Sequence, residues 1–274
     1  MAKYVPDIKT QRWVIIAPLR TKRPRDKDHT ESVCPFCPGN ERLTPPEVYR
    51  MGTGSADDAG WHVRVVPNLY PITDIHEVII HGPDHTSDIE RLPIDHVVKI
   101  LVTYRDRFRA HEHDGHVIIF NNHGFHAGAS LTHPHSQLVV VPRQINLDSL
   151  SREPIANVVE DSDRYQAYCP DFSQWPYEVW IAPKSKGNLF GDTADTDLPE
   201  LAEILQRILL KIERVHEGQG FMYNYYIYHG ADWFVRIIPR FVHRAGFELG
   251  TGLNVNITDP ARAAEELREL RKGF

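Results

Sequence analysis

The pattern of apolar and polar positions predicts several strands and one helix in the first part of the chain. Residues 62–85 predict two strands joined by a proline-rich turn, and residues 95–110 place apolar side chains along one stripe of a helix. Residues 117–120 predict a further strand. The β-branched run at residues 138–141 predicts a buried strand, which would hold the residues just before it in a fixed place.

The same order of patterns returns later in the chain. Residues 147–168 are polar without a clear period and predict a connector, and a helical stripe follows at residues 201–215. The strand segments that correspond to one another are 177–184 and 76–83, 223–230 and 117–124, and 233–240 and 136–143. We infer two copies of one unit with the order strand, strand, helix, strand, strand.

The two ends of the chain carry simpler patterns. Residues 11–18 predict a strand, and the basic, proline-broken segment 19–25 follows it. This segment is either a solvated loop or a clamp for an anionic ligand. Near the other end, Asp259 and Pro260 predict the N-cap and first turn of a helix that continues to about residue 271.

The bulk composition narrows the classes of partner. The chain has 274 residues, of which 41% are hydrophobic, with a formal charge of −6 and a pI near 6.2. This charge gives no general attraction to nucleic acid or to an anionic membrane, so we expect a small anionic ligand held by local groups. The sequence shows no signal-peptide pattern and no apolar run near the roughly 20 residues of a membrane span, which predicts a cytoplasmic protein.

Two of the three cysteines lie in the segment Cys34-Pro-Phe-Cys37. An odd count argues against a disulfide framework and leaves a metal site, a redox pair or two ordinary loop cysteines. The surrounding prolines predict irregular backbone, which favours the metal site over a thioredoxin-like motif. Among the sixteen histidines, His85 ends a turn and His133 precedes the buried strand, so these two best complete a tetrahedral zinc site. Four protein ligands would make that site structural rather than hydrolytic.

The segment His133-Pro-His135-Ser-Gln137 leads into the buried strand. In extended backbone His133 and His135 face the same side, so one ring could hold the metal while the other meets a substrate. Neutral imidazole is a competent nucleophile at neutral pH, and Gln137 could donate its amide to a phosphoryl oxygen. Because glutamine cannot deprotonate water, it suits a phosphate acceptor. The alternative is a buried, hydrogen-bonded histidine pair without a chemical role.

The second copy of the unit lacks this pair, because Asp232 occupies the position of His135. We therefore predict that the first unit carries the chemistry and that the second shapes the pocket. The small-residue loop at residues 121–130 precedes the histidine segment. Its glycines at positions 124 and 128 would let backbone amides approach an anion closely.

Short motifs recur along most of the chain, at residues 20–24, 34–41, 65–71, 82–85, 127–137, 175–178 and 246–252. Together they resemble the galactose-1-phosphate uridylyltransferase family of the histidine-triad superfamily. The resemblance implies an α+β fold of two tandem histidine-triad-like units, residues 1–146 and 147–274. Their antiparallel sheets would form a half-barrel with helices packed on the outside, and two chains would form a homodimer.

The resemblance also implies a double displacement, with His135 and Gln137 as the catalytic residues. A nucleotide would pass through His135 between hexose 1-phosphates, most simply UMP from UDP-glucose to galactose 1-phosphate in galactose metabolism. One structural Zn²⁺ per chain would be held by Cys34, Cys37, His85 and His133. The implied substrate-binding residues are Arg20, Arg23, Asn68, Tyr70, Asn122, Gly128, Ser130, Glu248 and Asn254.

Departures from the family pattern leave the substrates open. Arg236 stands where the family's second metal site has a histidine, so we predict no second metal. The lysine that usually precedes Gly246 is absent, and Ser136 replaces a glycine, as in relatives that include nucleoside-diphosphate-hexose phosphorylases. One alternative is a phosphorylase that passes a nucleotide from ADP-glucose or a dinucleoside polyphosphate to inorganic phosphate. The other is a zinc-stabilised nucleotide-binding module without turnover.

Overall fold

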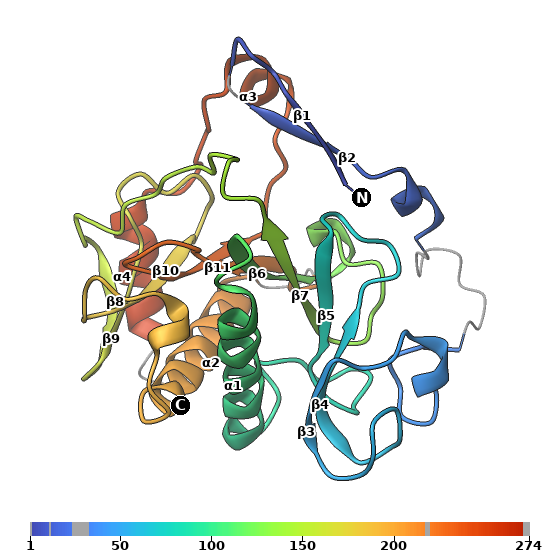
Figure 1. Cartoon of the computed structure of the whole chain (residues 1–274). Helices are drawn as coiled ribbons and strands as arrows, with labels where there is room; N and C mark the ends of the chain where they lie inside the picture. Colours follow the sequence, from blue (N-terminus) through green and yellow to red (C-terminus); the bar gives the residue numbers. More distant parts are fainter. Residues whose placement is uncertain (1, 11, 24–32, 217–219, 271–274) are drawn as a thin grey trace. The chain divides into compact units, whose positions relative to one another are not determined.

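The computed structural model describes residues 2–10, 12–23, 33–216 and 220–270 (Figure 1). No helix in these ranges combines the length and apolar character needed to cross a bilayer. The chain divides into two compact units. The first comprises Met1–Asp88, Lys99–Asn121 and Ser130–Ser149, and the second comprises Ile89–Val98, Asn122–Ala129 and Leu150–Phe274.

The strands that build the first unit are mostly antiparallel neighbours in one sheet. They are β3 (Tyr49–Gly52), β4 (Trp61–Pro67), β5 (Ile75–Ile80), β6 (His116–His123) and β7 (His135–Val141), in the spatial order β3-β4-β5-β7-β6. A separate hairpin pairs β1 (Lys3–Pro6) with β2 (Trp13–Ile16). Helix α1 spans Ile94–His111, and short 3₁₀ turns span Pro18–Lys22 (η1) and Glu41–Leu43 (η3). A further 3₁₀ turn, Phe125–Ala127 (η4), belongs to the second unit.

The second unit repeats this strand order. Its strands are β8 (Val158–Asp161), β9 (Tyr165–Tyr168), β10 (Val179–Pro183), β11 (Tyr223–Ile227) and β12 (Val235–Pro239), in the order β8-β9-β10-β12-β11. Its helices are η5 (Phe190–Asp192), α2 (Leu198–Val215), α3 (Gly246–Thr251) and α4 (Pro260–Glu269). The predicted α+β class with antiparallel sheets is confirmed. The division of roles between residues 1–146 and 147–274 stays a prediction.

The predicted connector at residues 147–168 is wrong in its second half, where β8 and β9 lie. Each strand has only four residues, too few to show a clear two-residue alternation. What holds β9 in place is tertiary: Tyr165, Ala167 and Tyr168 are buried, and β9 pairs along its length with β10. Strand β3 was not predicted for the same reason, since it is equally short.

The helices of the second unit form where apolar side chains share one face. α2 buries Leu201, Ile204, Leu205 and Ile208, and it packs against β9 and β10. α4 begins as predicted, because the Asp259 carboxylate accepts hydrogen bonds from the backbone N–H groups of Ala261 and Arg262. The helix was predicted to continue to about residue 271, which lies outside the described residues, and within them α4 ends at Glu269.

Strand β7 lies between β5 and β6, and all seven of its residues are buried. It begins at His135, so the catalytic candidate is part of the strand rather than the residue before it. Successive side chains of a strand point to opposite faces, so His135 and Gln137 share one face and Ser136 lies on the other. Burying each valine of the strand contributes about 1.5–3 kcal/mol, which makes β7 a rigid support.

An ion-pair cluster on the first unit predicts a pH-dependent stability. His111 Nε2 lies 3.0 Å from Glu77 Oε1, and its Nδ1 lies 2.9 Å from Asp114 Oδ2. The hydrogen bond to Glu77 raises the pKa of His111 above its ordinary value of 6.5. Protonated His111 therefore adds stability that is fully present below its unfolded-state pKa and is lost as the pH rises through the raised value.

We expect His111→Gln to lower the free energy of unfolding at about pH 6 and to cost less at about pH 9. Urea unfolding of the variant and wild type at both pH values measures the difference. His113→Gln is the matched control, because the His113 side chain is 90% exposed. An equal loss for His111→Gln at both pH values would contradict the assigned ion pair.

Candidate active site and metal centre

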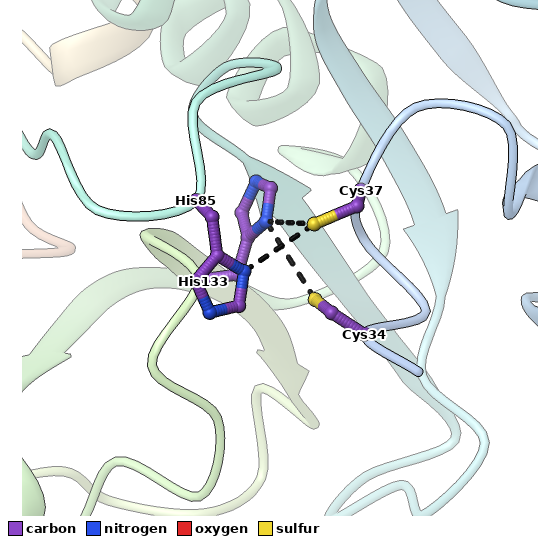
Figure 2. Close-up of side chains that lie close together, drawn as sticks. All are labelled: Cys34, Cys37, His85 and His133. Atoms are coloured by element: carbon purple, nitrogen blue, oxygen red, sulfur yellow. Dashed lines mark hydrogen bonds between the residues drawn. The ribbon is translucent and has the colours of Figure 1, made fainter. Parts of the chain in front are cut away.

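Cys34, Cys37, His85 and His133 converge in the first unit, with one ligand atom from each within 4.8 Å of the others (Figure 2). His133 Nδ1 lies 3.7 Å from Cys34 Sγ and 3.6 Å from Cys37 Sγ, and His85 Nδ1 lies 3.3 Å from Cys37 Sγ. Tetrahedral zinc, with Zn–S near 2.3 Å and Zn–N near 2.05 Å, places sulfur and nitrogen ligands about 3.6 Å apart. The group could therefore hold a metal ion, and its donors suit zinc.

Hydrogen bonds orient the ligand atoms of this group. His133 Nε2 donates to the Gly82 carbonyl at 2.8 Å, which leaves the Nδ1 lone pair for the metal. The Cys34 carbonyl accepts hydrogen bonds from Asn40 Nδ2 at 2.9 Å and from the Cys37 backbone N–H at 3.4 Å. This tight turn continues into further turns and the short η3, as the prolines predicted, rather than into the long helix of a redox motif.

The ring of His135 is held in one tautomer. Its Nδ1 lies 2.8 Å from the His133 carbonyl oxygen, which can only accept, so Nδ1 carries the hydrogen. Nε2 is then the atom with a free lone pair. Burial lowers the pKa of His135 to about 4, so the ring is neutral at neutral pH. The result is an imidazole that needs no base before it attacks an electrophile.

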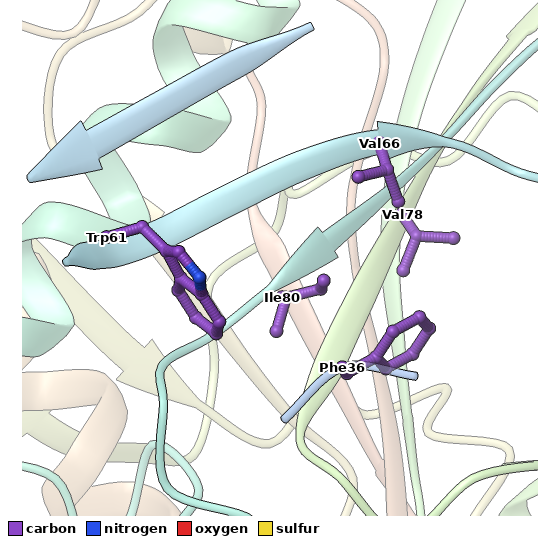
Figure 3. Packing of buried hydrophobic residues seen from close by; sticks show 5 residues of the cluster. All are labelled: Phe36, Trp61, Val66, Val78 and Ile80. Atoms are coloured by element: carbon purple, nitrogen blue, oxygen red, sulfur yellow. The ribbon is translucent and has the colours of Figure 1, made fainter. Parts of the chain in front are cut away.

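Phe36, between the two cysteines, connects the metal group to His135. Its ring meets that of His135 edge-on, with centroids 5.3 Å apart, and that of His133 at 6.0 Å. On its other side Phe36 belongs to a buried cluster with Trp61, Val66, Val78 and Ile80 (Figure 3). The loop that carries the cysteines therefore also supplies a wall beside His135.

A cavity of about 220 Å³ opens beside His135 and Gln137 within the first unit. Its walls are partly apolar, and the sequence-predicted site residues among them are Arg23, Asn68, Tyr70, Ser130, His135 and Gln137. None of the described residues that line the cavity is an aspartate or a glutamate. A ligand in this cavity meets a cation, amides and hydroxyls, a combination that suits an anion with a polar organic group attached.

The Arg20 side chain contacts a residue that lines this cavity. Its guanidinium donates to the Tyr70 carbonyl at 2.8 Å, and burial lowers the pKa of the group without neutralising it. The Tyr70 backbone N–H donates to Asn68 Oδ1 at 2.8 Å, which fixes the loop between β4 and β5. The basic segment therefore contacts the loop that carries Asn68 and Tyr70, and its role as an anion clamp stays a prediction.

The opposite face of β7 carries a buried polar network. Ser136 Oγ and Tyr104 Oη both lie beside His81 Nε2, at 2.8 Å and 2.9 Å, and His81 Nδ1 lies 2.6 Å from Asp88 Oδ1. Asn121 Nδ2 donates to the His135 carbonyl at 3.0 Å. All of these side chains are buried, and the network serves to fix the backbone on either side of His135.

The remaining predicted residues belong to the second unit. Asn122 Oδ1 accepts a hydrogen bond from Asn224 at 2.7 Å, and Gly128 has a left-handed backbone with φ of +90°. Glu248 and Asn254 line one small pocket together, and Glu248 Oε2 accepts the Ala245 N–H at 3.0 Å. Their predicted contacts with phosphate and hexose stay predictions.

In the second unit, other residues occupy the positions that correspond to the histidine motif. Asp232, at the position of His135, has a φ of +60° and pairs with Arg152 at 3.1 Å. Arg236, which stands where the family's second metal site has a histidine, is buried and forms two hydrogen bonds with Glu178, at 2.7 Å and 3.0 Å. The side chains of Asp232 and Arg236 therefore both form ion pairs. The absence of a second metal stays a prediction.

Two residues beside the catalytic candidates were missed by the sequence reasoning. Phe36 was not among the predicted site residues, although a large apolar residue in a proline-rich loop is a signal for packing. His76 was passed over within an apolar strand, yet it is 4% exposed and contacts Gln137. A single polar side chain among buried strand positions would have been the signal.

Comparison with known proteins agrees with this geometry. The family described as galactose-1-phosphate uridyl transferase, N-terminal domain, matches residues 73–141, which contain His85, His133, His135 and Gln137. The galactose-1-phosphate uridylyltransferase of Thermotoga maritima is 25% identical, covering 95% of this chain and 96% of that protein. These matches make the chain similar to the galactose-1-phosphate uridylyltransferase family. The predicted resemblance to that family is therefore confirmed.

A phosphorylase is also similar to this chain. The ADP-glucose phosphorylase of Arabidopsis thaliana is 28% identical, covering 95% of this chain and 91% of that protein. A crystal structure of an ADP-glucose phosphorylase from the same plant with bound ADP-glucose matches with a TM-score of 0.77 at 27% identity. That match covers 98% of this chain and 99% of the other. One of these relatives is named as a uridylyltransferase and the other as a phosphorylase of ADP-glucose.

Proposed function

We propose that this enzyme transfers a nucleoside monophosphate from a nucleoside-diphosphate hexose through a covalent intermediate on His135. The observation that carries the proposal is the fixed tautomer of His135, which presents Nε2 as a nucleophile at a cavity lined by Arg23 and Gln137. In the first step the Nε2 lone pair attacks the α-phosphorus. The P–O bond to the leaving hexose 1-phosphate breaks, and that group departs as an anion that needs no proton.

In the second step an acceptor phosphate oxygen attacks the same phosphorus and the P–N bond breaks. The electron pair returns to Nε2, so His135 is regenerated. The Gln137 amide donates to a non-bridging oxygen as charge shifts onto it. No carboxylate lines the cavity within the described residues, so a water molecule there lacks a general base. A phosphate acceptor arrives ionised, which favours transfer over hydrolysis.

The first candidate reaction moves UMP from UDP-glucose to galactose 1-phosphate, and the second moves AMP from ADP-glucose to inorganic phosphate. The second candidate is favoured by the similarity to the Arabidopsis phosphorylase, and the first by the similarity to the Thermotoga transferase. A zinc-stabilised binding module without turnover would need neither the Nε2 lone pair of His135 nor the Gln137 amide beside it. The two enzymatic candidates share the covalent step and differ in base and acceptor.

Zinc in the proposed role is structural. Cys34, Cys37, His85 and His133 would hold it, and four protein ligands leave no position for water or substrate. The metal would tie the cysteine loop to the start of β7, and thereby hold Phe36 beside His135. We further infer a cytoplasmic homodimer.

A panel of donors tests the proposal. We expect incubation with UDP-glucose, ADP-glucose or GDP-mannose alone to add the mass of the matching nucleotide to His135, as an acid-labile and base-stable adduct found by intact-mass spectrometry. The preferred donor gives the base, and release of the adduct by galactose 1-phosphate or inorganic phosphate gives the acceptor. Metal-loaded protein that forms no adduct with any donor would refute the covalent mechanism.

A further inference from the structure

His76 lies next to Gln137 because of the strand register. In the pairing of β5 with β7, Val78 stands opposite Gln137 and His76 opposite Val139. Residues opposite one another share a face of the sheet, so His76 is the diagonal neighbour of Gln137 on the face that carries His135. A slip of one residue would turn His76 to the other face. His76 is 4% exposed and Gln137 is 3% exposed.

The backbone decides which ring nitrogen of His76 carries the hydrogen. The Ile72 backbone N–H donates to His76 Nδ1 at 2.9 Å. A backbone amide can only donate, so Nδ1 bears no hydrogen, and the neutral ring carries it on Nε2. Burial lowers the pKa of His76 to about 4, with smaller effects of Arg20 and Arg23, which keeps the ring neutral. His76 is therefore a donor at Nε2 and an acceptor at Nδ1.

This tautomer in turn decides the orientation of the Gln137 amide. His76 Nε2 lies 3.0 Å from Gln137 Oε1 and donates to it. A reversed amide would place two donors against each other. Asn68 Nδ2 also lies 3.2 Å from His76 Nε2, but it is itself a donor, since Asn68 Oδ1 accepts the Tyr70 N–H. The shorter contact to Gln137 is therefore the hydrogen bond, and the Asn68 amide hydrogens remain available to a ligand.

We propose that His76 is a positioning residue that locks the Gln137 amide with its NH₂ group toward the transferring phosphoryl. The inference rests on the proposed function, because it assigns that NH₂ group to a phosphoryl oxygen. Without the lock the amide could turn its carbonyl oxygen to the phosphate, where two hydrogen-bond acceptors would face each other with no hydrogen between them. In the described part of the chain, His76 is the hydrogen-bond partner of the Gln137 side chain, and no other protein acceptor takes its NH₂ group.

Four variants test the lock: His76→Phe, His76→Gln, Gln137→Ala and the His76→Phe/Gln137→Ala double variant. We expect His76→Phe to lower kcat of adduct formation roughly 10- to 100-fold, with little change in KM, metal content or Tm. His76→Gln restores a donor at the same reach and should recover much of the rate. In the double variant the loss of rate should equal that of Gln137→Ala alone, because His76 acts only through the Gln137 amide, which this variant lacks.

Losses that multiply in the double variant, or full activity of His76→Phe, would overturn the inference. The lock has a second readout that needs no turnover. Nitrogen-15 NMR of histidine-labelled protein, with the His76 signals assigned from the His76→Phe spectrum, should show the hydrogen on Nε2. A hydrogen on Nδ1 would overturn the lock even in an active enzyme. A wild type with the expected tautomer but no nucleotide adduct would instead refute the proposed function.

Discussion

His135→Asn is expected to abolish nucleotide transfer while leaving the fold and the metal intact. The asparagine amide nitrogen can take the place of Nδ1 in the hydrogen bond to the His133 carbonyl, which is 2.8 Å long in the wild type. It offers nothing at the position of Nε2, the atom that forms the P–N bond. The variant therefore removes the nucleophile and keeps the packing against Phe36.

We expect kcat/KM to fall at least about 10⁴-fold, a loss of about 5 kcal/mol of transition-state stabilisation. Intact-mass spectrometry should show no nucleotide adduct after incubation with the preferred donor. Metal content and Tm should match the wild type. His113→Asn, on a fully exposed side chain, is the control that keeps full activity. An adduct on the His135→Asn protein would place the nucleophile elsewhere.

Cys37→Ser is expected to remove the metal and much of the stability of the first unit. Cys37 Sγ approaches both histidine ligands, at 3.3 Å and 3.6 Å, and its loss removes one of the four ligands of the proposed tetrahedron. Structural zinc in small peptides binds with about 10–16 kcal/mol, part of which is folding free energy. We expect the variant to lose at least about 3 kcal/mol, or roughly 6–12 °C in Tm. Metal content by elemental analysis should fall from one per chain toward zero.

Chelation gives the matching experiment on unaltered protein. A strong chelator should lower the Tm of the wild type to that of Cys37→Ser and should leave the Tm of the variant unchanged. Cys169→Ser is the control substitution, because Cys169 is buried in the second unit and should keep one metal per chain. Full metal retention by Cys37→Ser would refute the ligand set. A stable, metal-free Cys37→Ser protein would refute the structural role.

The metal and the nucleophile should be coupled through Phe36. Phe36 lies between the cysteines in the sequence, its ring contacts the rings of both His133 and His135, and it also lines the cavity. Release of the metal frees the loop that positions this ring, so chelated protein should lose transfer activity even where β7 stays folded. This explains how a metal without an open coordination position can still matter for catalysis.

The sequence alone predicted the repeated strand order, the four candidate metal ligands and the segment that carries the proposed nucleophile. Long strands with β-branched residues and helices with one apolar stripe follow from local periodicity, and that is why β7, α1 and α2 were predicted near their observed bounds. Cys34, Cys37, His85 and His133 followed from the chemistry of soft ligands, before any distance was known. The short strands β8 and β9 were missed, because pairing with neighbours rather than pattern defines them.

Only the tertiary structure decided which atoms face the cavity. The tautomer of His135 depends on a carbonyl two residues away, and that of His76 depends on the Ile72 backbone N–H. Gln137 is oriented by a side chain 61 residues earlier, through the register of β5 with β7. Residue type sets what a side chain can donate or accept. Which hydrogen it carries and where it points depend on partners that only the folded chain brings within hydrogen-bond distance.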